Sequence, residues 1–129
     1  MTQVLVDTSL WRRYLAGRTT RAETGALDGL LDEDDALLVH VAVIAELVLG
    51  GLAPREEELV SRLPNAPEIA SAEVLAFVRD RKLSRRKVGW LDAQLLASAL
   101  VAGARLWSHD RALARAAHEL GVGFAPPKA

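Results

Sequence analysis

The feature of this chain that most restricts its fold is a regular alternation of short apolar runs with longer amphipathic segments. Apolar, β-favouring runs occupy residues 4–6 and 36–39, Arg105-Leu106-Trp107 is a third strand candidate, and segments with the 3.6-residue period of helices separate them. Strands that read as continuous apolar runs are typical of parallel sheets covered on both faces. The pattern predicts an α/β fold, a three-layer α/β/α sandwich around a short, mostly parallel central sheet.

Residues that start or stop helices bound most of the expected helical segments. Gly50 and Gly103 follow two apolar helical patterns, and Pro54 opens another. Further short strands are expected at 68–70 and 122–124. The expected helices run from near Leu10, from Ala22 to Leu31, from Ala42 to Leu49, from Pro54, from Ser71 to about Lys82, from Leu91 to Ala102 and from Asp110 to Leu120.

Length and composition bound the class of protein. A chain of 129 residues is long enough for one sizeable core and too short for two ordinary domains. The absence of cysteine excludes disulfides and thiolate metal sites. A net charge of −1 gives no argument for or against a nucleic-acid partner. With no signal-peptide pattern and no membrane-spanning run, we expect a single domain over residues 1–129, cytoplasmic and without a membrane partner.

Three aspartates stand where a strand ends or a helix begins. Asp7 directly follows the first strand, with the hydroxyls of Thr8 and Ser9 beside it, and we predict a supporting role for Thr8. Asp92 and Asp110 head the inward-facing stripes of their helices, and Asp110 also follows a strand. In the helix that Asp92 begins, Gln94 and Ser98 are expected to face outward. Ligands of open α/β sheets bind at the carboxyl ends of the strands. Each aspartate is equally compatible with an N-terminal helix cap, and the two roles can coexist.

Glu46 is harder to explain as a surface residue. It is the only charged residue of the segment 41–49, and a helix that is apolar nearly all round is usually buried. A buried carboxylate needs a partner or a metal. Glu46 therefore marks either one narrow solvent-exposed edge of the helix or a functional cleft.

Bringing these carboxylates together requires a cation. Two of them within a few ångströms repel by roughly 4 kcal/mol at an effective dielectric constant near 20. A divalent ion removes this repulsion, and oxygen-only ligands suit Mg²⁺ or Mn²⁺ rather than zinc. The chemistry that such a site favours is metal-assisted hydrolysis of a phosphodiester bond.

Four acid-containing segments follow one another along the chain: Val4-Leu5-Val6-Asp7-Thr8-Ser9, Ala45-Glu46-Leu47 with Gly50, Leu91-Asp92-Ala93-Gln94-Leu95-Leu96-Ala97, and Trp107-Ser108-His109-Asp110. In this order and spacing they resemble the PIN-domain ribonucleases, and among them the VapC-type toxins of bacterial toxin–antitoxin pairs. The resemblance covers most of the chain. It implies a PIN-like sandwich and a Mg²⁺- or Mn²⁺-dependent endoribonuclease that forms a homodimer and binds a cognate antitoxin through apolar helix surfaces.

The same resemblance assigns roles to individual residues. It implies that Asp7 and Asp92 are the principal metal ligands, that Glu46 and Asp110 complete the catalytic acidic site, and that Ser108 orients an acid by hydrogen bonding. The chain departs from the family pattern in two places. Gln94 replaces a small or apolar residue, and the hydroxyl residue often found shortly before the glutamate is missing. These departures concern fine geometry and substrate choice.

Basic residues gather just before Asp92, and Arg85, Arg86 and Lys87 are the nearest of them. With Arg12, one turn past Asp7, they are candidates for binding RNA phosphates, for receiving an antitoxin, or for a plain solvated loop. Three tryptophans offer possible stacking surfaces: Trp11 and Trp107 are expected in the core and Trp90 near the site. Of the histidines, His109 is a candidate proton carrier, and His40 and His118 are expected at the surface or an edge.

Two other functions compete with a toxin nuclease. A non-catalytic protein-binding module is possible if every acid is a helix cap, although Glu46 is then unexplained. A PIN-type nuclease of RNA processing fits the same acids without being a toxin. A phosphoacceptor receiver domain is rejected because it requires an acidic pair after the first strand, and a haloacid-dehalogenase-type phosphatase because Ser9 stands where it requires a second acid.

Overall fold

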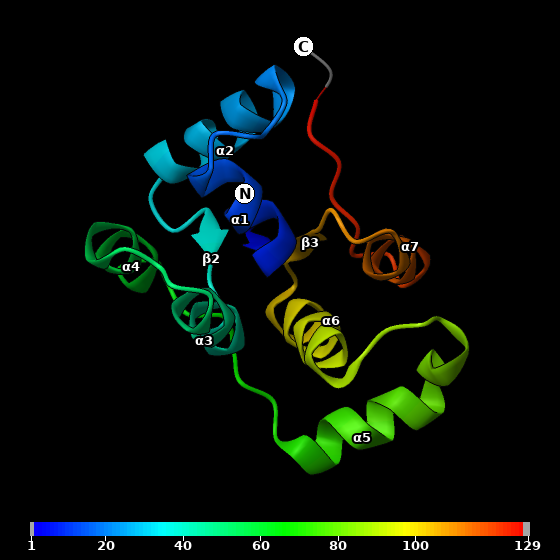
Figure 1. The fold of residues 1–129 in the computed structure, drawn as a ribbon. Helices are drawn as coiled ribbons and strands as arrows, with labels where there is room; N and C mark the ends of the chain where they lie inside the picture. Colours follow the sequence, from blue (N-terminus) through cyan, green and yellow to red (C-terminus); the bar gives the residue numbers. More distant parts are fainter. Residues whose placement is uncertain (1, 128–129) are drawn as a thin grey trace.

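A small parallel sheet of short, buried strands forms the centre of the fold (Figure 1). The structure, a computed structural model, describes residues 2–127. The strands are β1 (Val4–Val6), β2 (Leu37–Leu38) and β3 (Arg105–Trp107), in the order β2-β1-β3. In the parallel register, Leu5 of β1 lies opposite Leu38 on one side and Leu106 on the other. Asp7, the residue after the middle strand, is therefore central at the carboxyl edge of the sheet.

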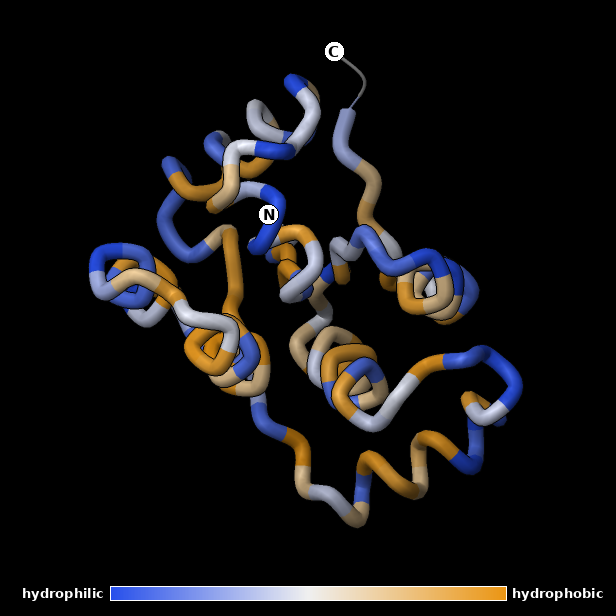
Figure 2. The backbone as a smooth tube through the Cα atoms, viewed as in Figure 1, coloured by the Kyte–Doolittle hydropathy of each residue, from blue (hydrophilic) through white to orange (hydrophobic). Residues whose placement is uncertain are grey.

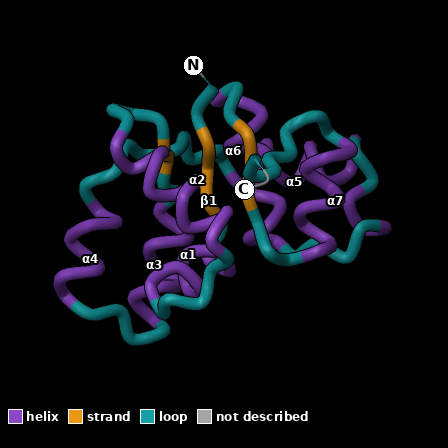
Figure 3. Tube along the Cα trace, turned by 90° about the horizontal axis from the view of Figure 1, so that it is seen from above, coloured by secondary structure: helices purple, strands orange, loops and turns teal. Residues whose placement is uncertain are grey.

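Helices cover the sheet on both sides. Figure 1, which looks along the strands, shows α1 and α2 above the sheet and α3 and α6 below it, and Figure 3 shows α4 and α7 flanking the strands on either side. The predicted three-layer α/β/α architecture is confirmed. The helices are α1 (Thr8–Leu15), α2 (Arg21–Asp32), α3 (Val41–Leu49), α4 (Pro54–Ser61), α5 (Ser71–Asp80), the short 3₁₀ helix η1 (Leu83–Arg85), α6 (Trp90–Ala102) and α7 (Arg111–Glu119).

Helix α6 is the most deeply packed helix of the fold. Leu95 and Leu96 have no exposed surface, and burial of each such side chain stabilises the fold by about 1.5–3 kcal/mol. Figure 2 shows the hydrophobic residues concentrated in the strands and in the central helices. Ser98, which the helical pattern placed on an outward face, is fully buried, and its hydroxyl donates to the carbonyl oxygen of Pro67 at 2.7 Å. The prediction was wrong because the chain around Pro67 covers that face of the helix.

The two additional strands predicted near the sheet edges differ from the structure. No strand forms at 68–70. Pairing with Val39 occurs earlier, at Asn65, and it ends before Pro67, which has no N–H to donate. At 122–124 the predicted strand is reduced to a single parallel bridge between Leu106 and Gly123.

Helix α3 is less buried than its apolar sequence predicted. Only Val43 and Leu47 are buried, whereas Val41, Val48 and Leu49 are exposed, Leu49 to 87%. The reason is that the helix packs with one side against α1 and α4 and leaves the other side uncovered. We call Val41, Val48 and Leu49 the apolar flank.

His40 is also placed differently from the prediction. It is the N-cap of α3, and its Nδ1 atom accepts a hydrogen bond from the backbone N–H of Ala42 at 3.0 Å. This role draws the ring inside, so that His40 is only 2% exposed. His118 is exposed, as predicted. Within residues 2–127, no helix has the length and the apolar composition needed to cross a membrane.

Candidate active site

Four acids from four different elements face one another at the carboxyl edge of the sheet. Asp7 follows β1, Glu46 lies in α3, Asp92 is in the first turn of α6, and Asp110 immediately precedes α7. Burial raises the pKa of the Asp92 carboxyl above its usual value, and the negative charges of the other three acids raise it further. A hydrogen bond from the backbone N–H of Gly89, at 3.3 Å, opposes the rise. The structure thus brings all four predicted acids within electrostatic range.

Asp7 is the most firmly held of these acids. Its side chain is buried, and three donors satisfy it: the backbone N–H of Thr8 binds Oδ1 at 2.8 Å, and the hydroxyls of Ser9 and Ser108 donate to Oδ2 at 2.8 and 2.7 Å. Hydrogen bonds to a charged group stabilise a fold by about 1.5–3 kcal/mol each. Oδ1 carries only one of these bonds and keeps a lone pair for a ligand.

The two serines also link the site to the loop after β3. The Ser108 hydroxyl accepts from the backbone N–H of Asp110 at 2.9 Å, and the Ser9 hydroxyl accepts from the backbone N–H of His109 at 3.0 Å. Each serine therefore connects Asp7 to the segment that carries Asp110. Sequence reasoning noted Ser9 as a neighbour of Asp7 but did not assign it to the site. Its distance from residue 108 along the chain concealed this pairing.

Glu46 is attached to the first helix by Thr8. The Thr8 hydroxyl donates to Glu46 Oε1 at 2.5 Å, and the Arg12 guanidinium lies 3.4 Å from the Glu46 carbonyl oxygen. Glu46 is half-buried, whereas the residues of the apolar flank on the same helix are exposed. The helix therefore carries an acid toward the site and apolar side chains toward solvent.

The aspartates also cap their helices. Asp110 Oδ1 accepts from the backbone N–H of Leu113 at 3.1 Å, and Asp7 and Asp92 accept from backbone N–H groups at the starts of α1 and α6. Capping and convergence at one site occur together, because the positive helix ends also favour ionised carboxylates.

The donor set fits a hydrated divalent cation. Among residues 2–127, no three histidine, aspartate or glutamate side chains lie close enough together to hold a metal ion by themselves. Mg²⁺ does not require such a group, since it usually binds one or two carboxylates and keeps several waters. Oxygen-only donors at the site, a raised Asp92 pKa and the free lone pair of Asp7 Oδ1 are the properties expected of such a site.

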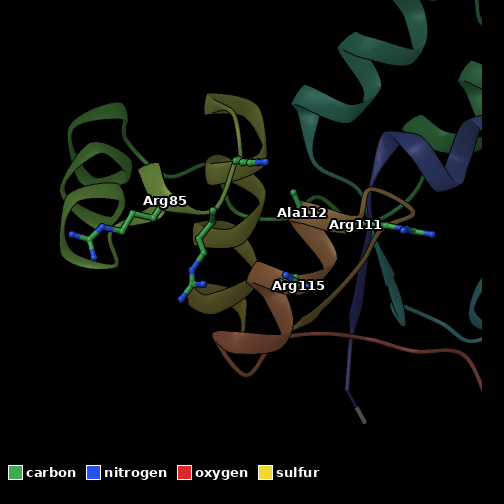
Figure 4. Close-up of a pocket in the computed structure, with 6 residues that line it drawn as sticks. Arg85, Arg111, Ala112 and Arg115 are labelled. Carbon is green, nitrogen blue, oxygen red and sulfur yellow. The ribbon is translucent and has the colours of Figure 1, made fainter.

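A basic pocket of about 340 Å³ lies between η1 and the start of α7 (Figure 4). It contains the predicted Arg85, Arg86 and Lys87, and two arginines that sequence reasoning did not single out. The predicted Arg12 is not part of it and lines a different pocket, with Leu47 and Glu56. The lining of the basic pocket is Arg85, Arg86, Lys87, Arg111, Ala112 and Arg115.

The aromatic and histidine candidates separate clearly. Trp11 and Trp107 are buried in the core, as predicted, and Trp90 is 47% exposed at the first position of α6. His109 Nε2 lies 2.6 Å from Glu23 Oε2. Burial of Glu23 raises its pKa, but hydrogen bonds from Thr20 and the neighbouring His109 outweigh burial and keep the pKa below its usual value. His109 therefore faces α2 rather than the acids.

Comparison with known proteins places this geometry in a family. The model of the PIN domain family matches residues 4–119. Ribonuclease VapC32 of Mycobacterium tuberculosis, in strains CDC 1551 / Oshkosh and H37Rv, is 42% identical to this chain over 125 residues, which are 95% of this chain and 96% of the relative.

Solved structures agree in fold. FitAcB from Neisseria gonorrhoeae has a TM-score of 0.63 at 20% identity and covers 90% of this chain and 94% of its own. PAE2754 from Pyrobaculum aerophilum has a TM-score of 0.55 at 17% identity and covers 88% and 85%. These two likenesses concern the fold alone. The family match and the extent of identity to the mycobacterial relative together show that this chain belongs to the PIN domain family, among its VapC-type members.

Proposed function

We propose that residues 1–129 form a single PIN-like nuclease domain, a Mg²⁺- or Mn²⁺-dependent endoribonuclease that acts as the toxin of a toxin–antitoxin pair. The observation that carries the proposal is the convergence of Asp7, Glu46 and Asp110 on Asp92, whose carboxyl pKa is raised by burial and further by these three charges. The name of the mycobacterial relative, a ribonuclease, supports RNA as the substrate.

The residues of the chain divide the task among them. Asp7 and Asp92 would hold the cation, and Glu46 and Asp110 would complete the acidic site. Ser9 and Ser108 hold the Asp7 carboxylate in place by donating to Oδ2, and Thr8 fixes Glu46. A bound divalent cation would activate water as a nucleophile and stabilise the charge that develops on the phosphate.

Cleavage of a mixed structured RNA by purified, partner-free protein tests the proposal. We expect cleavage with Mg²⁺ or Mn²⁺, none with EDTA, and a loss of at least about a hundredfold in Asp7→Asn and Asp92→Asn. Folding of the variants is checked by circular dichroism. If the wild type neither cleaves RNA nor binds Mn²⁺ in calorimetry, the nuclease proposal fails and a protein-binding module becomes the better account.

The apolar flank supports the proposal that the chain binds an antitoxin. Exposed Val41, Val48 and Leu49 provide an apolar surface on which an antitoxin helix can dock.

We also propose that the chain forms a homodimer in the cytoplasm. Light scattering coupled to size exclusion gives the mass of the free protein. A complex with the product of a neighbouring small reading frame that encodes a DNA-binding protein would distinguish a toxin from an RNA-processing nuclease.

A further inference from the structure

We propose that the basic pocket holds the sugar–phosphate backbone of single-stranded RNA beside the cleavage site, and that Arg111 and Arg115 of α7 are RNA-binding residues. This inference rests on the proposed nuclease function and extends it from the acids to the path of the substrate.

The first support is the excess of unpaired positive charge. Five cationic side chains line the pocket, and Arg86 alone is paired, with Glu119 at 2.8 Å. Within residues 2–127, the side chains of Arg85, Lys87, Arg111 and Arg115 make no hydrogen bond or ion pair. Gathering like charges destabilises a folded chain, whereas a bound polyanion relieves the repulsion and releases counterions.

The second support is the position of the pocket relative to the acids. Arg111 directly follows Asp110, and Lys87 lies two residues before Gly89, whose N–H binds the Asp92 carboxylate. Helix α7, which Asp110 caps, and the loop that leads into the helix carrying Asp92 thus line the basic pocket. RNA cleaved at the acids has to lie across an adjoining surface, and this one has the complementary charge.

The third support is the spread of the cationic groups. Figure 4 shows Arg85 and Arg111 extending in opposite directions from the two edges of the pocket, with Arg115 between them. A strip of separated cations fits a chain of successive phosphates better than one small anion. It also favours RNA over an acidic protein segment, because a substrate must continue from the acids whereas a partner protein can dock elsewhere, for example on the apolar flank.

The loop that carries half of the pocket has an unusual backbone conformation. Lys82 and Lys87 both have positive φ angles, 54° and 58°, which are uncommon for residues other than glycine. Buried Leu83 anchors the loop, and the backbone N–H of Arg86 donates to the Leu83 carbonyl at 2.9 Å. Figure 2 shows this connection between α5 and α6 as strongly hydrophilic. An exposed basic loop with a strained backbone is typical of a binding element.

The test compares the double variant Arg111→Ala/Arg115→Ala with Arg55→Ala, which removes a cation from α4, outside the pocket. Cleavage kinetics are measured with Mg²⁺, and RNA affinity by fluorescence anisotropy in EDTA with a labelled single strand. We expect the double variant to raise KM and weaken binding by about tenfold, with kcat unchanged. The slope of log K against the logarithm of salt concentration should become shallower by ~0.7 for each phosphate that the variant no longer neutralises.

The control Arg55→Ala should match the wild type, and thermal melts should show that all variants fold. Wild-type KM and RNA affinity in the double variant would overturn the pocket as an RNA site while the nuclease proposal stands. Unchanged RNA binding with weakened binding of the purified antitoxin would assign the pocket to a protein partner instead. A wild type that neither cleaves nor binds RNA would remove the proposed function, and this inference with it.

Discussion

Helix α3 and the pair α6–α7 both bring acids to the same site, yet they present opposite surfaces around it. The α3 side exposes the apolar flank, whereas the α6–α7 side exposes the basic pocket. Apolar surface that remains exposed favours a protein partner, and unpaired cations favour phosphates. The difference suggests that regulation and substrate binding reach one acidic centre from two sides. Each of the following predictions tests that separation.

The largest effect is expected at the centre that the two sides share. Replacing both Ser9 and Ser108 with alanine leaves Asp7 with only the backbone N–H of Thr8 as a donor. We expect cleavage to fall by about a hundredfold, as for the loss of fixed donors in other active sites, and the free energy of unfolding by about 3–6 kcal/mol. Urea unfolding and initial cleavage rates measure the two effects.

The single variants Ser9→Ala and Ser108→Ala serve as matched controls, each keeping one hydroxyl on Oδ2. They should lie between the wild type and the double variant in both measurements. A double variant with full activity would show that the position of Asp7 does not depend on these hydroxyls. Binding to an antitoxin should not change in any of the three, because the apolar flank is untouched.

The next prediction introduces one negative charge on each side. Arg115→Glu should lower kcat/KM for RNA by about thirtyfold, since it removes a cation that binds phosphate and adds repulsion, and leave antitoxin binding unchanged. Leu49→Glu should weaken antitoxin binding by about tenfold and leave cleavage by the free protein unchanged. Cleavage kinetics and calorimetric titration with the antitoxin give the two values for each variant.

The pattern of effects matters more than either value. If Leu49→Glu also slows the free enzyme, or if Arg115→Glu also weakens the antitoxin complex, the two sides are not separate. Both residues are exposed, so neither substitution removes core packing. A conservative Arg115→Lys variant should retain most of the kcat/KM, because a phosphate contact requires the charge more than the shape of the side chain.

The two sides also differ in how far sequence predicted them. Asp7, Asp92 and Asp110 could be found because each stands at a strand end or a helix start, where local rules apply. Arg111 and Arg115 could not be found in this way, because they join the basic pocket only when α7 packs beside a loop some 25 residues earlier in the chain. Glu46 could be found because it is the one charged residue in an otherwise apolar helical segment. The burial of α3 was overestimated, because periodicity does not tell which apolar faces of a helix pack against another element. His40 was misplaced for a related reason: capping from inside the fold has no sequence signal when the residue is a histidine.

Replacing Asp92 should have a smaller effect, which raises the stability of the metal-free protein while it lowers activity. Burial and the charges of Asp7, Glu46 and Asp110 raise the pKa of its carboxyl, so the ionised form destabilises the metal-free fold at neutral pH. Asp92→Asn keeps an acceptor for the Gly89 N–H and removes the charge. Because solvent screens this half-buried group, we expect a gain of only about 1 kcal/mol in the free energy of unfolding in EDTA.

The same variant should lose the stabilisation that Mn²⁺ gives to the wild type, which a thermal melt with and without the ion measures. Glu119→Gln, outside the acidic site, is a control for a general effect of removing negative charge. An Asp92→Asn protein that is less stable than the wild type without metal would contradict the convergence of the four acids.

The smallest effect distinguishes the two sides by pH. Burial lowers the pKa of His40 at the start of α3, and Glu68 opposes this only in part, whereas burial raises the pKa of Asp92 at the start of α6. For His40, the unfolded chain binds more protons below about pH 6.5, so its stabilising contribution is complete above 6.5 and is lost as the pH falls toward the folded-state pKa. For Asp92 the sign is opposite: above about pH 3.8 the folded state binds more protons, so stability falls as the pH rises through the raised pKa.

Urea unfolding at pH 7.5 and 6.0 should show a loss of less than about 0.8 kcal/mol from His40. His40→Asn keeps an acceptor for the Ala42 N–H and should abolish that loss, and an equal loss in the variant would mean that the proton binds elsewhere. Acidification from pH 7.5 to 6.0 should therefore loosen the start of α3, next to the apolar flank, but should not loosen the start of α6, because protonation of Asp92 stabilises the fold.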